Sequence, residues 1–218
     1  MKEYTILPIS AVKLFKSKDL YILAGMYLSA CSGRSSGDTI STDITQKQLA
    51  ELTGVDEEYI RKRFMPRLKE SGFCNVECRQ IEYTTKRNTY WLPNPKRNFR
   101  IIRSGLFRDS DLSSEEKGVL IGLYCNCING TYRFDLSDVQ MSERLGVSRG
   151  TYLKYKKSLS AKGIICTGEE HSNLLDYEHP NALLLIYPHL GFSEIQGDSR
   201  IYRPSNISLL ANTSLIIM

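Results

Sequence analysis

Two stretches of the chain, 92 residues apart, follow the same order of capping residue, short helix, glycine turn and basic helix. They are QLAELTGVDEEYIRKRFMPRLKESG (48–72) and QMSERLGVSRGTYLKYKKSLSAKG (140–163). The matches at this single offset pair Gln48 with Gln140, Leu49 with Met141, Glu51 with Glu143, Gly54 with Gly146, and Val55 with Val147. A repeat of this kind indicates two copies of one folding unit. A chain of 218 residues has room for two such units of about one hundred residues each.

The first helix of each copy is apolar and lies upstream of these stretches. We expect it over residues 21–30 in one copy and 117–125 in the other, where Ser113 or Ser114 is a suitable N-cap. Further upstream, LFK (14–16) matches LFR (106–108) at the same offset. The repeat therefore extends beyond the two stretches that reveal it.

The second and third helices are delimited by capping residues. TQKQ (45–48) and SDVQ (137–140) place a hydroxyl at the N-cap and a glutamine three residues later, which predicts a capping box. Gly54 and Gly146 tolerate the left-handed conformation just past a helix end, and Asp56 and Ser148 are N-caps for the helix that follows. This is the helix-turn-helix layout, in which the last helix enters the major groove of DNA.

Each third helix is followed by a segment with the alternation of a two-stranded hairpin. The first, residues 72–93, turns at the polar tip TTKRN (84–88), and the second, residues 163–188, has a longer and acidic tip. A helix-turn-helix followed by such a hairpin is a winged helix. We therefore predict a mainly α-helical chain with small β-hairpin wings (α+β), built as two tandem winged helix-turn-helix domains.

The predicted boundaries follow from this layout. They are 1–92 for the first winged-helix domain, 93–103 for a basic linker with two prolines, 104–191 for the second domain and 192–218 for a C-terminal tail. In the first domain, Pro66 falls inside the third helix, and Val55 and Leu68 are one residue further apart than Val147 and Leu159. Both features predict a bulge or break near Pro66.

The net charge of +5 is modest, but the basic residues are concentrated. Three stretches without an acidic residue, 59–69, 84–108 and 148–162, hold 17 of the 29 lysines and arginines. They cover both third helices, the first wing and the linker. Such clusters are suitable donors to DNA phosphates.

The period of the second recognition helix separates its faces. Val147, Tyr152, Tyr155 and Leu159 are expected to face the core, with Arg149, Thr151, Lys154 and Lys157 directed outward. Arg149 lies in the first turn and can pair with guanine, whereas the two lysines are expected to contact phosphate. A solvated polar face is the alternative interpretation.

The other predicted DNA contacts are less regular. The first recognition helix offers Arg61 and Lys62 but begins with Glu57 and Glu58, so dimerisation is its rival role. The first wing and the linker complete the predicted surface with Lys86, Arg87, Lys96, Arg97, Arg100 and Arg103. The acidic second wing is expected to avoid phosphate and either touch a partner or remain a solvated loop.

The second copy resembles the helix-turn-helix domain of bacterial plasmid and phage replication initiators. The resemblance is carried by the runs GLFRDSDLSSEEKGVLIGLY and LSDVQMSERLGVSRGTYLKYKKSLSAKGII. As a layout, the resemblance covers roughly residues 4–190, and winged-helix transcription regulators share the pattern. It implies sequence-specific binding of double-stranded DNA, with replication initiation or its control on a mobile element as the role. Transcription regulation and a winged-helix protein-interaction module are the alternatives, and a homodimer is compatible with each.

Other classes find little support. The six cysteines lack metal-site spacing, and no phosphate-cradling glycine loop or nucleophile motif occurs, so no metal, cofactor or catalytic residue is predicted. The loop EEHSNLLDYEH (169–179) holds carboxylates and histidines, but a polar wing loop accounts for it. No apolar run is long enough to span a bilayer, and we expect a cytoplasmic protein that is not an enzyme.

Overall fold

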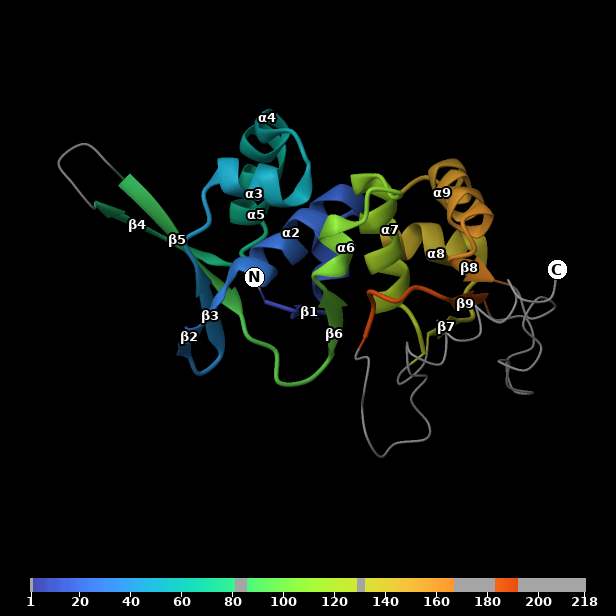
Figure 1. Ribbon diagram of the computed structural model, residues 1–218, viewed down its shortest axis with the longest axis horizontal. Helices are drawn as coiled ribbons and strands as arrows, with labels where there is room; N and C mark the ends of the chain where they lie inside the picture. The colour runs from blue at the N-terminus through green and yellow to red at the C-terminus, as the bar shows by residue number, and fades with distance from the viewer. Residues whose placement is uncertain (1, 81–85, 129–131, 167–182, 192–218) are drawn as a thin grey trace.

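The computed structural model describes residues 2–80, 86–128, 132–166 and 183–191. The fold is α+β, with helices and three small antiparallel sheets among these residues (Figure 1). The predicted tail, 192–218, and the predicted tip of the second wing, within residues 167–182, lie outside the described residues.

The first half of the fold runs from β1 to β5. In chain order it contains β1 (Tyr4–Pro8), α1 (Ala11–Leu14), α2 (Ser17–Ser29), β2 (Cys31–Ser36), β3 (Thr39–Thr42), α3 (Gln46–Thr53), α4 (Glu57–Tyr59), the π-helical turn η1 (Ile60–Phe64), α5 (Met65–Glu70), β4 (Asn75–Gln80) and β5 (Lys86–Pro93). Strands β2, β3, β5 and β4 form one sheet in that order. The β4–β5 hairpin projects away from the body of the molecule (Figure 1).

The second half of the fold runs from β6 to β9 and repeats this order, without a counterpart of β2 among the described residues. It contains β6 (Phe99–Arg103), α6 (Gly105–Arg108), α7 (Ser114–Cys125), β7 (Arg133–Phe134), α8 (Asp138–Leu145), α9 (Arg149–Ala161), β8 (Ile165–Cys166) and β9 (Leu183–Leu185). Its sheet has the order β7-β9-β8, as β3-β5-β4 does in the first half. The predicted repeat is therefore a repeat of secondary structure and strand order.

The predicted capping residues are confirmed in both halves, whereas the first long helix begins at Ser17 and not at residue 21 as predicted. Thr45 and Ser137 form complete capping boxes at the start of α3 and α8, and Ser113 forms another with Glu116 at the start of α7. Gly54 and Gly146 end α3 and α8 with φ of 64° and 61°, which is the left-handed region that favours glycine.

The irregularity expected near Pro66 is a π-helical turn. The Met65 N–H donates to the carbonyl of Ile60, five residues back, directly before Pro66. A π turn accommodates one extra residue without breaking the helix, and it relieves the clash that proline makes with the preceding turn. The helix α4–η1–α5 is thus continuous and still places Leu68 in the core.

The segment predicted as a linker belongs partly to the fold. Residues 99–103 are strand β6, which pairs antiparallel with β1, and Ile102 forms a further bridge to Leu190. Pro95 and its neighbours connect β5 to β6, so only the first part of the predicted linker is a connection.

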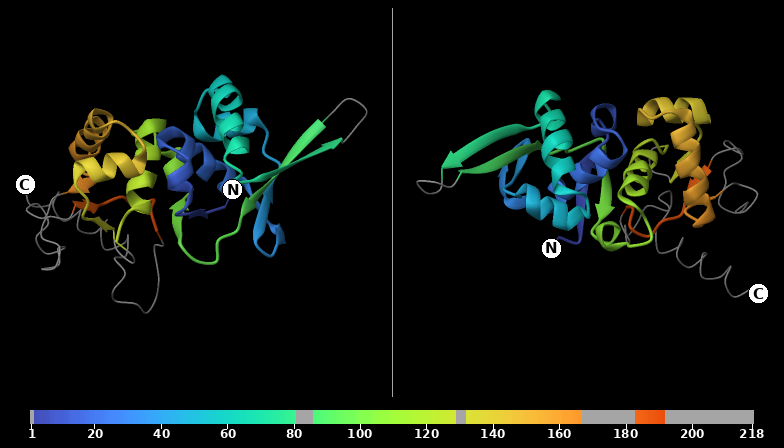
Figure 2. Two further views of the ribbon diagram at one scale, coloured as in Figure 1. Left: turned by 180° about the vertical axis from the view of Figure 1, so that it is seen from behind. Right: turned by 90° about the horizontal axis from the view of Figure 1, so that it is seen from above.

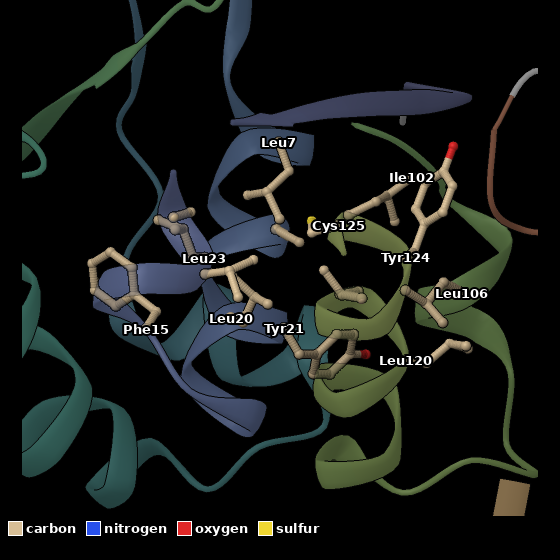
Figure 3. Close-up of a cluster of buried hydrophobic side chains, with 14 of the residues drawn as sticks. Leu7, Phe15, Leu20, Tyr21, Leu23, Ile102, Leu106, Leu120, Tyr124 and Cys125 are labelled. Atoms are coloured by element: carbon tan, nitrogen blue, oxygen red, sulfur yellow. The ribbon is translucent and has the colours of Figure 1, made fainter. Parts of the chain in front are cut away.

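The two halves share one hydrophobic core. Helices α2 and α7 pack on each other more extensively than any other pair of elements. Leu20 and Tyr21 from α2 and Leu120 and Tyr124 from α7 belong to one cluster of buried side chains (Figure 3). Burial of these side chains from both halves in one cluster makes the pair a single packed body.

The close approach of α7 to α2 depends on a glycine. A Cβ at Gly118 would lie 1.9 Å from the carbonyl oxygen of Ser17, so no other residue fits without moving the helices apart. An ion pair between Lys18 and Glu115, at 2.5 Å, lies at the same crossing. The relative placement of the halves is therefore fixed by direct backbone contact.

Candidate nucleic-acid interface

Helix α9 presents a basic outward face. Its N-cap Ser148 accepts a hydrogen bond from the Thr151 N–H, and Tyr152 and Leu159 are buried on its inner side. Val147 and Tyr155 are half-buried against the same core, as predicted. The four predicted contact residues of this helix are all exposed: Arg149, Thr151, Lys154 and Lys157.

Three cations on this face are available to a ligand. Among the described residues, no ion pair involves Arg149, Lys154 or Lys157, and the ammonium of Lys154 lies 5.6 Å from the ring centre of Tyr155. The hydroxyl of Thr151 is engaged with that of Ser148 at 2.8 Å. The face therefore offers one guanidinium in the first turn and two ammonium groups further along the helix.

The other two lysines of the basic stretch hold α9 in place. Lys156 pairs with Asp138 of α8 at 2.6 Å, and Lys162 pairs with Glu116 of α7 at 2.7 Å. Ser158 also donates to Glu116, at 2.6 Å. Burial alone would raise the pKa of Glu116, but hydrogen bonds from Lys162, Ser158 and Ser113 outweigh it and lower that pKa to about 2. Glu116 is thus an ionised anchor under α9.

The third helix of the first half has a matching anchor. Asp19 is buried in the first turn of α2 and accepts hydrogen bonds from Arg67, at 2.6 Å, and from the Tyr59 hydroxyl, at 2.9 Å. Asp19 and Glu116 both occupy the third position of their helices. The signal for both residues was an acid in the first turn of an apolar helix, but we did not predict them from the sequence.

The outward face of α4–η1–α5 is mixed in charge. Arg61, Lys62 and Arg63 are exposed, but Lys62 is paired with Glu58, and Glu57 is exposed beside it. The cap that starts this helix is Asp56, a further acid. Its first turn therefore opposes phosphate, whereas the first turn of α9 carries Arg149 and no acid.

The first wing differs from its prediction at the tip. Lys86 and Arg87 were expected in the turn, but they are the first residues of β5 and pair in register with Gln80 and Arg79. The strands extend further than the polar residues suggested because β-pairing satisfies the backbone whatever the side chains are. Arg87 is exposed, and its Nε donates to the Asp43 carbonyl at 3.4 Å.

The predicted linker contacts divide into two groups. Arg97 is exposed, and Lys96 is exposed but pairs with Asp38 at 3.0 Å. Arg100 instead donates to the carbonyls of Tyr124 and Cys127, at 3.0 and 2.7 Å, and lies over the Tyr124 ring.

Arg103 likewise donates to the Gly191 carbonyl, at 3.2 Å. Both side chains are half-buried and bound to backbone carbonyls, so they are less available to DNA than the sequence suggested. Arg100 thus binds carbonyls at and just beyond the C-terminal end of α7, where a cation is favoured, and Arg103 binds the carbonyl that follows the bridge from Ile102 to Leu190. Both arginines hold the fold together.

Helices α4 and α9 lie on the same side of the molecule, along its upper edge in Figure 1, and the reverse view in Figure 2 agrees. Because α2 and α7 are locked together, both third helices are presented by one rigid body. Each third helix carries three exposed cations outside any described ion pair, Arg149, Lys154 and Lys157 on α9 and Arg61, Arg63 and Lys69 on α4–η1–α5, but only the helix of the first half begins with acids.

The described residues show no arrangement of three or more His, Cys, Asp or Glu side chains suited to a metal ion. None of the described helices combines the length and apolar character needed to cross a membrane. Burial raises the pKa of the Cys74 thiol to about 11 and that of the Cys125 thiol to about 12, which opposes formation of a reactive thiolate.

No protein-family model, no curated protein and no solved structure matches this chain.

Proposed function

We propose that this chain binds double-stranded DNA sequence-specifically through two tandem winged-helix modules, with α9 placed in a major groove. The observation that carries the proposal is the outward face of α9. Arg149, Lys154 and Lys157 are exposed there and unpaired among the described residues, while the neighbouring Lys156 and Lys162 are committed to anchoring the helix. A rigidly held helix with free cations suits groove binding.

The order of elements supports the same function. Each half has a long helix, a strand, two helices joined by a capped glycine turn, and two strands that pair with the earlier strand. This is the order of a winged helix, and the long helix of each half packs against its twin. By resemblance, the role would be replication initiation or its control on a bacterial mobile element.

The roles of the residues follow from their positions. Arg149 would meet base edges, because the first turn of a recognition helix reaches deepest into the groove. Lys154 and Lys157 would contact phosphates and set orientation without selecting sequence. Arg61 and Arg87 on the first half and Arg97 in the connection between β5 and β6 are exposed and would add phosphate contacts.

The test is fluorescence anisotropy of the full chain with duplexes from around its own gene and with a scrambled duplex, across a salt series. We expect selective binding to one duplex. The logarithm of the association constant should fall linearly with the logarithm of salt concentration, with a slope of about −0.9 for each phosphate neutralised. Equal, weak binding to all duplexes at moderate salt would overturn the proposal. Footprinting would then separate the roles, because iterated direct repeats favour an initiator and a single inverted repeat favours a transcription repressor.

A further inference from the structure

Gly150 has no structural reason to be a glycine. It lies in the first turn of α9, and a Cβ added there would meet no atom within 4 Å. Its φ is not positive, unlike that of the helix-ending glycines. Glycine lowers the stability of a helix relative to alanine, so the fold alone would favour a larger residue. The position leaves the helix backbone open to a close approach from outside.

Leu153 is an apolar side chain on the basic face. It is 38% exposed, and it stands outside the core that buries Tyr152 and Leu159. Arg149, Leu153 and Lys157 follow one another at four-residue intervals, which places them in one row along the helix. In this row, the apolar side chain of Leu153 lies between the cations of Arg149 and Lys157.

We propose that Leu153 contacts the 5-methyl group of a thymine, and that Gly150 allows α9 to approach closely enough for that contact. This inference rests on the proposed DNA binding. The major groove floor is polar except for the thymine methyl group, which apolar side chains recognise. Arg149 and Lys157 on either side would attract the duplex and hold Leu153 against it. The target is thus a thymine close to the base that Arg149 contacts.

The test starts from duplexes selected by the full chain from a randomised pool. In the enriched duplex, each thymine is replaced in turn by deoxyuridine, which removes only the methyl group. We expect one position at which this replacement weakens binding about fourfold, the change that burial of one methyl group produces. Leu153→Ala should bind the thymine and deoxyuridine duplexes equally at that position.

Val139→Ala is the matched control, because Val139 is an exposed apolar residue on α8 rather than on the α9 row. It should keep the discrimination between thymine and deoxyuridine. Gly150→Ala should weaken binding by at least the same factor as Leu153→Ala while its unfolding midpoint does not fall.

The outcomes separate this inference from the proposed function. If no duplex is enriched, both are overturned. If a duplex is enriched but has no methyl-sensitive position, or if Leu153→Ala keeps the discrimination, DNA binding stands and the thymine contact is overturned. Unchanged affinity of Gly150→Ala would overturn the close approach at that residue.

Discussion

The third helices of the two halves are anchored alike but present different surfaces. In each half, a buried acid in the first turn of the long helix binds the third helix, with Asp19 holding Arg67 and Glu116 holding Lys162. Outward, the first half begins this helix with Asp56, Glu57 and Glu58, whereas α9 begins with Ser148 and Arg149. Residues at matching positions in the two halves build the same scaffold, whereas the residues that differ set the charge that each outward surface presents.

The largest effect on stability is expected from a substitution at the contact between the two halves. Gly118→Ala would place a methyl group against the Ser17 backbone and should lower the free energy of unfolding by about 3 kcal/mol. The tryptophan at position 91, the only one in the chain, lies in the first half, so its fluorescence reports on the half that does not contain the substitution. Urea unfolding followed by this fluorescence and by circular dichroism should give one coincident, shifted transition.

Gly150→Ala is the matched control, because its Cβ would meet open space. A fluorescence transition that stays at the wild-type midpoint in Gly118→Ala would mean that the halves unfold independently. The shared core would then not be a single cooperative unit.

The second-largest effect is expected on folding stability at low pH, through Glu116, which anchors α9. The pKa of Glu116 is lowered from 4.5 to about 2, so its ionised form stabilises the folded state fully above pH 4.5. This contribution is lost as pH falls through about 2. Between pH 4.5 and about pH 2, the free energy of unfolding of the wild type should fall by on the order of 2–3 kcal/mol more than that of Glu116→Gln.

The measurement is urea unfolding at several values between pH 6 and pH 3, where part of the loss is already present. Glu143→Gln, at an exposed position of α8, serves as control and should follow the wild type. Parallel pH profiles for the wild type and Glu116→Gln would contradict the anchor.

The third effect is on binding. Arg149→Ala should cost about 1–3 kcal/mol of affinity for the selected duplex and relax base preference, because a bidentate contact with guanine is lost. Competition with duplexes altered at single positions measures this preference. An equal loss on every duplex would make Arg149 a phosphate contact instead.

The smallest effect is expected in the first half. Arg61→Ala should cost less than about 1 kcal/mol of affinity, because acids occupy the preceding turn of its helix and its contact would be with phosphate. The salt dependence of binding measures the loss as a decrease in slope of about 1. A loss equal to that of Arg149→Ala would show that the two third helices contribute equally.

The sequence predicted the parts of the fold that local chemistry controls. Capping boxes, left-handed glycines and the extra residue before Pro66 each act within a few residues, and all are present in the structure. The LFK–LFR match was misleading. It pairs Leu14 with Leu106, but Leu14 ends α1, whereas Leu106 lies in the first turn of α6.

Contacts between distant segments could not be predicted from the sequence. The pairing of β1 with β6 and the approach of Gly118 to Ser17 join segments about one hundred residues apart, and neither leaves a local pattern. The same is true of the site. Periodicity identified the exposed face of α9, but it could not show that Lys156, Lys162, Arg100 and Arg103 are used inside the fold.

The central claim is that α9, rather than the third helix of the first half, is the main DNA surface. The most direct measurement compares the duplex affinities of two triple variants, Arg149/Lys154/Lys157→Ala and Arg61/Arg63/Lys69→Ala, each removing three exposed cations from one helix. We expect the affinity of the first variant to fall about 100-fold or more, and the slope of its affinity against salt concentration to decrease by about 3. The affinity of the second variant should fall less than about tenfold. A larger loss in the second variant would contradict the account.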